Sequence, residues 1–255
     1  MPRLQTQNRT LGRASIHTLD MDYLIVIVPI VAPVLFWAAY HYHKDRHMPE
    51  PFGNLVLCFG LGVLSFYLGK MMYLGLDVIG LRFDAFALAE SSRAGLLAYS
   101  ILAIGGIEEL TKLVPFLIVV LRFKAFDEPV DGIIYAAFIA LGFATVENIQ
   151  YLQYVTGLEM LGRGFASPLV HIMFASIWAY YIGLAFLQQQ RLAFVVLKYL
   201  GLAALMHGIY DFIVIALPVA ALPSSAFLIL AVWLWRMCLI RNLHRKTSES
   251  GANGG

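Results

Sequence analysis

Residues 95–121 read GLLAYSILAIGGIEELTKLVPFLIVVL, an apolar run with three charged side chains inside it. At 1.5 Å of rise per residue, a helix of this length crosses the ~30 Å hydrocarbon core of a bilayer. Two of the charges are the adjacent carboxylates Glu108 and Glu109, and the third is Lys112. The run therefore predicts a membrane-spanning helix that carries ionisable groups near its middle.

The composition of the whole chain points to the same environment. Of its 255 residues, 60% are hydrophobic and 13% are charged, whereas about 25% of the residues in a soluble domain are charged. The net charge of +2 is too small to favour a nucleic-acid partner. Cys58 and Cys238 lie inside apolar runs, so we expect buried thiols and not a disulfide or a cysteine metal site.

Seven apolar runs are long enough to cross a bilayer. Backbone groups in lipid must be hydrogen-bonded within the chain, and no alternating strand pattern appears, so the sequence predicts an all-α polytopic transmembrane helical bundle. We expect one domain over residues 22–243, preceded by a polar tail (1–21, with Met21 as an alternative start) and followed by a disordered tail (244–255). The predicted spans are 22–40, 52–76, 95–121, 131–155, 168–187, 192–217 and 223–241.

Loop charges predict the orientation of this bundle. Seven spans put the termini on opposite sides, and basic residues are enriched on the cytoplasmic side. Without the uncertain N-terminal tail, the N-terminal side has three basic residues: Arg82, Arg93 and Arg163. The C-terminal side has eight: Lys44, Arg46, Arg122, Lys124, Arg191, Arg241, Arg245 and Lys246. We therefore expect the N-terminus outside and the C-terminus in the cytoplasm.

Spans three to six carry polar side chains that a lipid-facing helix avoids. A charged group at the centre of a span costs roughly 2.5–3.5 kcal/mol even on the lenient insertion scale. These groups must therefore face one another, a metal ion or a water-filled cavity. The residues concerned are Glu108, Glu109, Lys112, Glu147, Asn148, His171, His207 and Asp211.

Helical spacing predicts how these groups meet. Glu108 and Lys112 are four residues apart, as are His207 and Asp211, so each pair can hydrogen-bond along its own helix. Glu109 is rotated by about 100° from Glu108, so one carboxylate can face the bundle centre while the other supports it. Counting along the four spans puts the cluster in one layer, between an interface and the midplane, in the extracytoplasmic half.

Carboxylates and imidazoles in such a layer suit the activation of a water molecule. Two histidines and a glutamate form the ligand set of many zinc hydrolases, which makes Glu147, His171 and His207 candidate ligands of a divalent metal, zinc being the first choice. Glu108 or Glu109 would act as general base. No HExxH motif is present, so a glutamate base without metal remains open. The candidate catalytic residues are Glu108, Glu109, Glu147, His171 and His207.

The same segments contain a series of motifs in one order. They are EExxK at residues 108–112, DGxxY at 131–135, GFxxxEN at 142–148, Arg163 in the next connection, His171, and HGIYD at 207–211. This series resembles the PrsW family of intramembrane proteases, which is related to the CAAX prenyl endopeptidases. EExxK alone occurs by chance in many helices, but the whole series covers residues 105–212 on four consecutive spans.

The resemblance implies an intramembrane endopeptidase that cuts membrane-anchored proteins at their extracytoplasmic side. In the founding branch of the family the substrate is a single-pass anti-sigma factor, so we expect a single-pass membrane protein as partner and the cytoplasmic membrane of a bacterium as location. Supporting roles fall to Lys112, Asn148, Arg163 and Asp211. Asp131 begins a predicted span after a proline, where helix capping is at least as good an explanation as chemistry.

Two other functions fit an intramembrane cluster of ionisable groups. A proton- or ion-coupled transporter also needs such groups, although the chain lacks the paired halves that many transporters have. A non-catalytic membrane scaffold is the third possibility. Lys70 and Asp77, near the end of the second predicted span, are explained by side chains that reach towards the interface.

Overall fold

The structure, a computed structural model, describes residues 27–42, 50–155, 157–217, 226–227, 229–235 and 237–238. Within these ranges the chain is helical and contains no strand, which confirms the predicted all-α class. The predicted tails at 1–21 and 244–255 lie outside the described residues, so the proposed domain limits stay a prediction. The last predicted span, 223–241, is described only in part and is helical there.

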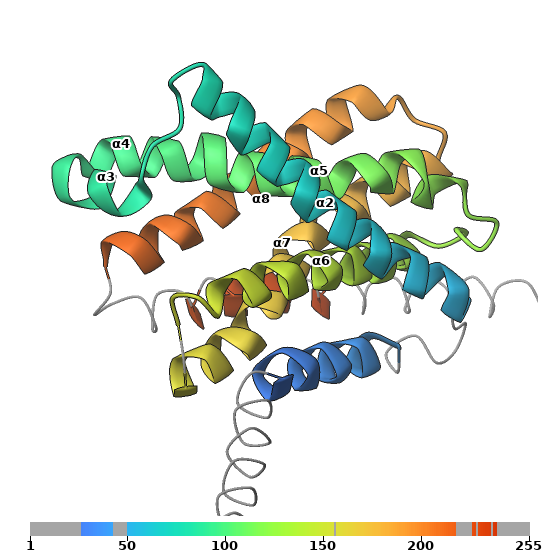
Figure 1. The fold of residues 1–255 in the computed structure, drawn as a ribbon. Coiled ribbons are helices and arrows are strands. Elements are labelled where there is room, and N and C mark those ends of the chain that lie inside the picture. Colours follow the sequence, from blue (N-terminus) through green and yellow to red (C-terminus); the bar gives the residue numbers. More distant parts are fainter. Residues whose placement is uncertain are drawn as a thin grey trace, which may run out of the picture.

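Helices account for every predicted span between residues 27 and 217 (Figure 1). A first helix, Ile27–Tyr42, is apolar and short. Four later helices are long and apolar enough to cross a membrane: α2, α6, α7 and α8. The elements that follow the first helix are α2 (Phe52–Val78), α3 (Ala85–Ser91), α4 (Arg93–Tyr99), η1 (Ser100–Gly105), α5 (Gly106–Ile118), η2 (Val120–Arg122), α6 (Pro129–Tyr151), α7 (Gly157–Leu187) and α8 (Leu192–Ala216).

Helices α6 and α7 form the centre of the bundle. In their most apolar segments 72% and 78% of the residues are buried, against 33% for α2 and 22% for α8. Helix α2 crosses α6 closely, since a Cβ atom on Gly62 or Gly142 would collide with the backbone of the other helix. Close approach at small residues is the usual way for helices to pack in lipid. The outer helices therefore leave much of their surface to lipid.

The predicted span 95–121 is covered by four helical elements, α4, η1, α5 and η2. A π-helical turn, η1, separates α4 from α5, and such turns often mark functional sites. Here η1 lies against α8: a Cβ on Gly105 would lie 2.5 Å from the Ala204 carbonyl oxygen, and one on Gly208 would collide with the backbone of Ile101. Glycine at both positions thus lets α8 approach the start of α5, where the two adjacent glutamates lie.

Helix α7 begins at Gly157, well before the predicted start at Pro168, so the prediction of a loop around Arg163 was wrong. Proline favours a helix start, but Pro168 lies inside α7. The extra turns are held by helix Ile27–Tyr42: Trp37 Nε1 donates a hydrogen bond to the Phe165 carbonyl (3.1 Å), and Gly164 touches the backbone of Pro29. This packing keeps the segment helical despite the proline.

Candidate active site

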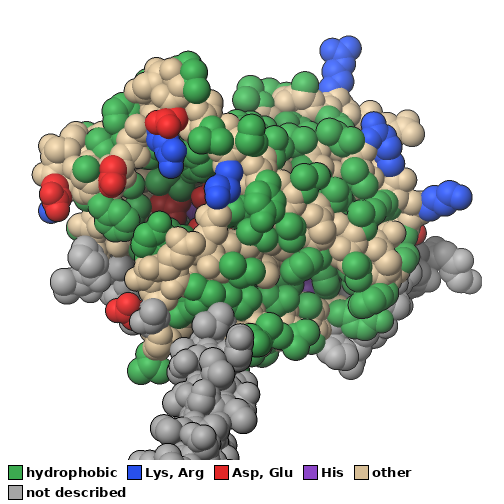
Figure 2. Space-filling view, viewed as in Figure 1, with side chains coloured by type: hydrophobic (Ala, Val, Ile, Leu, Met, Phe, Trp, Pro, Cys, Tyr) green, Lys and Arg blue, Asp and Glu red, His purple; other side chains and the backbone are tan. Residues whose placement is uncertain are grey.

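A cavity of about 460 Å³ opens between α2, the segment after it, α4, α5 and α6. Figure 2 shows the hollow, with acidic side chains at its floor and charged side chains of both signs around it. Because one water occupies about 30 Å³ in the liquid, the cavity has room for water and for part of a chain. The carboxylates of Glu108 and Glu147 both line it.

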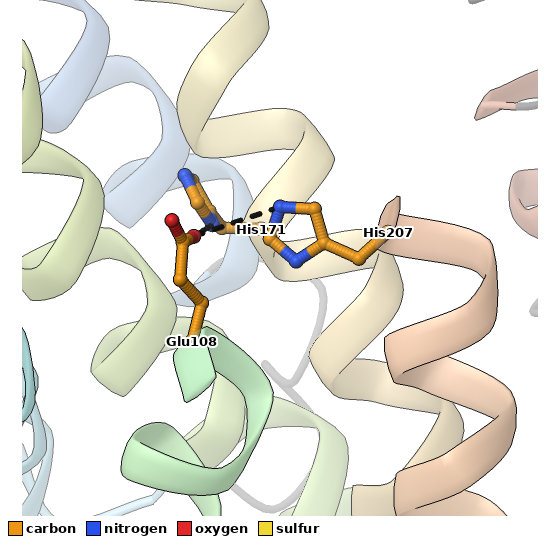
Figure 3. A group of neighbouring side chains, drawn as sticks. All are labelled: Glu108, His171 and His207. Carbon is orange, nitrogen blue, oxygen red and sulfur yellow. Dashed lines mark ion pairs between the residues drawn. The ribbon is translucent and has the colours of Figure 1, made fainter. Parts of the chain in front are cut away.

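Three side chains from three helices converge beside this cavity (Figure 3). Glu108 comes from α5, His171 from α7 and His207 from α8. Oε2 of Glu108 lies 3.8 Å from Nδ1 of His171 and 3.7 Å from Nε2 of His207. Each residue offers one possible ligand atom, and these atoms lie within 4.8 Å of one another. Their meeting agrees with the common depth predicted from residue counts.

Glu109 supports His207 from inside the bundle. Its side chain is fully buried and accepts hydrogen bonds from Nδ1 of His207 (2.7 Å), Nζ of Lys112 (2.6 Å) and Nε1 of Trp178 (2.9 Å). A proton on Nδ1 leaves the lone pair of Nε2 directed at Glu108. A carboxylate that fixes an imidazole in this way is typical of metal-bound histidines.

Two predicted pairings are therefore corrected. Lys112 pairs with Glu109, three residues away, and not with Glu108. The carboxylate that hydrogen-bonds His207 is Glu109, while Oδ2 of Asp211 remains 3.8 Å from Nε2 of His207. Spacings of three and four residues both bring side chains together on a helix. Contacts from α7 and α8 decided between them.

Glu147 supports His171 at the edge of the cavity. Its Oε2 accepts hydrogen bonds from Nε2 of His171 (2.9 Å) and Oγ of Ser167 (3.2 Å), and its Oε1 forms an ion pair with Arg163 (3.0 Å). The Arg163 guanidinium also stacks on the Tyr151 ring, 3.4 Å from its centroid. The group that converges thus differs from the predicted ligand set in one residue, with Glu108 in the place of Glu147.

Lys112 links the two halves of the site. Its side chain is fully buried, and its Nζ lies 2.6 Å from Glu109 and 3.1 Å from Nδ1 of His171. A buried ammonium needs such partners because removing it from water costs several kcal/mol. A metal ion on Nδ1 of His171 would take the place of the hydrogen bond from Lys112.

Several buried polar atoms of the site have no hydrogen-bond partner within the described part of the chain. The two carboxylate oxygens among them, Oε2 of Glu108 and Oδ2 of Asp211, both lie within 4 Å of Nε2 of His207. Oxygen and imidazole donors of this kind suit zinc and similar divalent ions. The residues present therefore fit a metal site. Two further buried atoms lack such a partner: Nε of Arg163, whose guanidinium pairs with Glu147, and Oδ1 of Asn148, the next residue after Glu147.

Three neighbours of the site were missed by the sequence reasoning: Ser167, Trp178 and Tyr151. A signal for two of them exists, since Ser167 lies four residues before His171 and Trp178 seven residues after it, on one face of α7. Asp131, in contrast, has a structural role. Its carboxylate accepts hydrogen bonds from the backbone N–H groups of Asp127 and Glu128 (2.9 and 2.7 Å) and completes a capping box at the start of α6.

Comparisons with known proteins agree with this site. A family model described as "PrsW family intramembrane metalloprotease" matches residues 50–237. The chain is 33% identical to Protease PrsW of Geobacillus kaustophilus over 73% of its length and 78% of that protein. It is 33% identical to Protease PrsW of Bacillus subtilis over 73% of its length and 81% of that protein. Protease PrsW of Clostridioides difficile is 31% identical, over 75% of this chain and 78% of that protein.

No solved structure matches the chain. The family match covers all four long apolar helices and all three converging side chains. It extends over well more than half of the chain, and the curated relatives are covered over most of their own length. The chain therefore belongs to the PrsW family and is an integral membrane protein that acts as an intramembrane protease.

Proposed function

We propose that the chain cleaves single-pass membrane proteins by means of a water molecule activated beside Glu108, His171 and His207. The observation that carries this proposal is the convergence of these three side chains beside a cavity of about 460 Å³ that Glu108 itself lines. A peptide bond of a substrate segment in the cavity would lie next to a carboxylate and two imidazoles. Family membership favours this reading over the transporter.

Glu108, His171 and His207 are the residues that would hold a divalent metal, most simply zinc. A metal held there supplies a Lewis acid that acidifies a water molecule and polarises the peptide carbonyl. His207 offers Nε2 because Glu109 occupies its Nδ1 (2.7 Å). His171 would offer Nδ1, in place of its hydrogen bond from Nζ of Lys112 (3.1 Å), because Glu147 occupies its Nε2 (2.9 Å). Glu109 and Glu147 are thus proposed as positioning residues, one for each histidine.

Asp211 is the proposed acceptor of the water proton. Its Oδ2 is buried and lacks a hydrogen-bond partner among the described residues, and it lies 3.8 Å from Nε2 of His207. It can therefore accept a proton at Oδ2 without breaking an existing contact. Arg163 pairs with Glu147, which lines the cavity, and its buried Nε lacks a hydrogen-bond partner among the described residues. It is the proposed contact for the backbone of the substrate.

Cleavage on the extracytoplasmic side belongs to the proposal. The cavity is lined by residues 66–74 of α2 and 143–151 of α6, in the second half of each helix. By the bias of basic residues these halves face outwards. An anti-sigma factor is one substrate of this kind, as a single-pass protein with an outer segment.

The test is to reconstitute the purified protein with a panel of single-pass substrates. We expect wild type to cleave at least one of them and Glu108→Gln, His171→Ala and His207→Ala to lose cleavage by at least about a thousandfold while staying folded. Glu90→Gln, on the exposed face of α3, is the matched control for Glu108→Gln. Full activity in Glu108→Gln would refute the site.

Metal content separates the two mechanisms. We expect the wild-type protein to bind about one divalent ion per chain, and His171→Ala and His207→Ala to bind much less. Asp211→Asn should keep the ion and lose cleavage, because its proposed role is proton transfer. If the protein is active without bound metal and chelators do not inhibit it, the metal is refuted. The glutamate side chains alone would then activate the water.

A further inference from the structure

Lys70 lies on the wall of the active-site cavity, although the sequence suggested only a side chain reaching towards the interface. It is exposed and lies eight residues before the end of α2 at Val78. Eight residues of helix correspond to about 12 Å, and the 27 residues of α2 to about 40 Å, roughly 5 Å more at each end than the hydrocarbon layer. With α2 centred in the bilayer, the backbone of Lys70 therefore lies about 7 Å inside the edge of that layer. A cation at this depth is costly unless water or an anion accompanies it.

Four charged residues line the cavity, and Lys70 differs from the others. Glu147 is paired with Arg163 (3.0 Å), Arg82 with Asp77 (3.7 Å), and Glu108 belongs to the proposed catalytic group. Lys70 has the Phe66 ring beside it, with Nζ 6.0 Å from the centroid. No carboxylate of the described residues forms an ion pair with it. Within the part of the chain that the structure describes, the cavity wall therefore carries a cation without a counter-charge.

We propose that Lys70 determines substrate specificity by pairing with an Asp or Glu side chain of the segment that enters the cavity. This inference rests on the proposed function. Lys70 and Glu108 line the same cavity, so a substrate segment that occupies it with the scissile bond at Glu108 lies in the cavity that Lys70 also lines. There an ion pair is stronger than in water, because the surrounding helices and lipid lower the effective dielectric constant. The preferred substrates are therefore single-pass segments with an acidic residue near the scissile bond.

The aromatic side chains of the cavity also fit a single-pass segment with an acidic residue. Phe66, Tyr73, Phe83, Tyr99 and Phe143 line it together with the charged groups. They offer apolar surface to the neighbouring residues of a transmembrane segment. Lys70 adds a cation that has no ion-pair partner among the described residues and that distinguishes an acidic side chain from a neutral one. Apolar contacts alone discriminate poorly between similar segments, so the cation would set the position of the segment.

The experiment uses synthetic single-pass peptides that share one apolar sequence and carry Asp, Asn or Lys at successive positions of the outer half. Cleavage by the wild-type protein is measured in vesicles of zwitterionic lipid, and binding is measured by fluorescence with Glu108→Gln. We expect Asp at one or two adjacent positions to raise kcat/KM roughly tenfold over Asn. Lys70→Met should remove this preference, and Lys70→Glu should transfer it to the Lys peptides.

Lys198→Met is the matched control, since Lys198 is also an exposed lysine over an aromatic ring of its own helix (Nζ 5.0 Å from the Tyr199 centroid) but lies outside the cavity. It should keep the Asp preference. Equal rates and equal binding for Asp and Asn peptides at every position would overturn the proposal.

Anionic lipid is the rival partner of Lys70. If Lys70→Met changes the cleavage of Asn peptides only when the vesicles contain phosphatidylglycerol, the lysine binds lipid and the proposal is wrong. If no peptide is cleaved by the wild-type protein, the proposed function fails for these substrates. The binding data still decide the role of Lys70 in that case: an Asp preference that Lys70→Met removes supports it, and its absence refutes it.

Discussion

The two histidines of the site are held by carboxylates in different surroundings. Glu109, which supports His207, is fully buried and accepts hydrogen bonds from three side chains. Glu147, which supports His171, has 16% of its side chain exposed and pairs with Arg163, which is 26% exposed. One half of the site is thus enclosed in the bundle, and the other half meets the cavity. We infer that the enclosed half sets the stability of the site and the open half adapts to the substrate.

Lys112→Met should give the largest effect, because it removes the ammonium group that pairs with the fully buried Glu109 carboxylate (2.6 Å). Breaking a buried pair by removing one partner costs about 3–5 kcal/mol. We expect a loss of this size in the free energy of unfolding, measured by denaturant titration in detergent. A loss below ~1 kcal/mol would mean that water reaches Glu109. The half of the site around His207 would then be open to solvent, against the comparison.

Glu109→Gln should weaken metal binding more than Glu147→Gln. The amide keeps the shape of the carboxylate but removes the negative charge beside the imidazole. Loss of such a supporting group typically lowers metal affinity about 10- to 100-fold. We expect this range for Glu109→Gln and a smaller change for Glu147→Gln, where water can compensate. Competition with a coloured zinc chelator measures both, and equal changes would contradict the comparison.

Trp178→Phe tests the third hydrogen bond of the enclosed half. Phenylalanine retains part of the apolar packing but cannot donate to Oε2 of Glu109, which Trp178 does at 2.9 Å. A hydrogen bond to a charged group contributes about 1.5–3 kcal/mol, so we expect a loss of this order in the free energy of unfolding. A double-mutant cycle with Glu109→Gln separates the hydrogen bond from the loss of buried ring volume. If Trp178→Phe costs as much in the Glu109→Gln background as in the wild type, the lost ring volume, and not the hydrogen bond to the charged carboxylate, is responsible.

Arg163→Met should have the smallest effect on stability. The Arg163–Glu147 pair is partly exposed, and pairs of this kind contribute about 0–1 kcal/mol. We expect a loss in this range together with a clear rise in KM, because the arginine lies at the open half. A loss of several kcal/mol would instead assign Glu147 and Arg163 to the structural framework.

Much of the fold was predictable because it depends on length and polarity. Apolar runs long enough to cross the bilayer must form helices in lipid, and the runs at 52–76, 131–155 and 192–217 match α2, α6 and α8 closely. The predicted start of α7 at Pro168 was too late because the helix Ile27–Tyr42, far away in the sequence, stabilises the turns before this proline. Local rules for proline contain no information about such a neighbour.

The sequence by itself determined that this chain is a helical membrane protein of the PrsW family, and that Glu108, Glu147, His171 and His207 share one layer. The membrane helices and the shared layer follow from the lengths of the apolar runs, from spacing along the chain and from the cost of a charge in lipid. The family follows from the resemblance of the ordered motifs to those of its members. Only the tertiary structure decided which carboxylate meets which histidine and that Lys70 faces the cavity. The rotation of each helix and its distance from its neighbours depend on side-chain and backbone contacts, such as the glycine contact of η1 with α8. Counting residues along the chain does not predict these contacts.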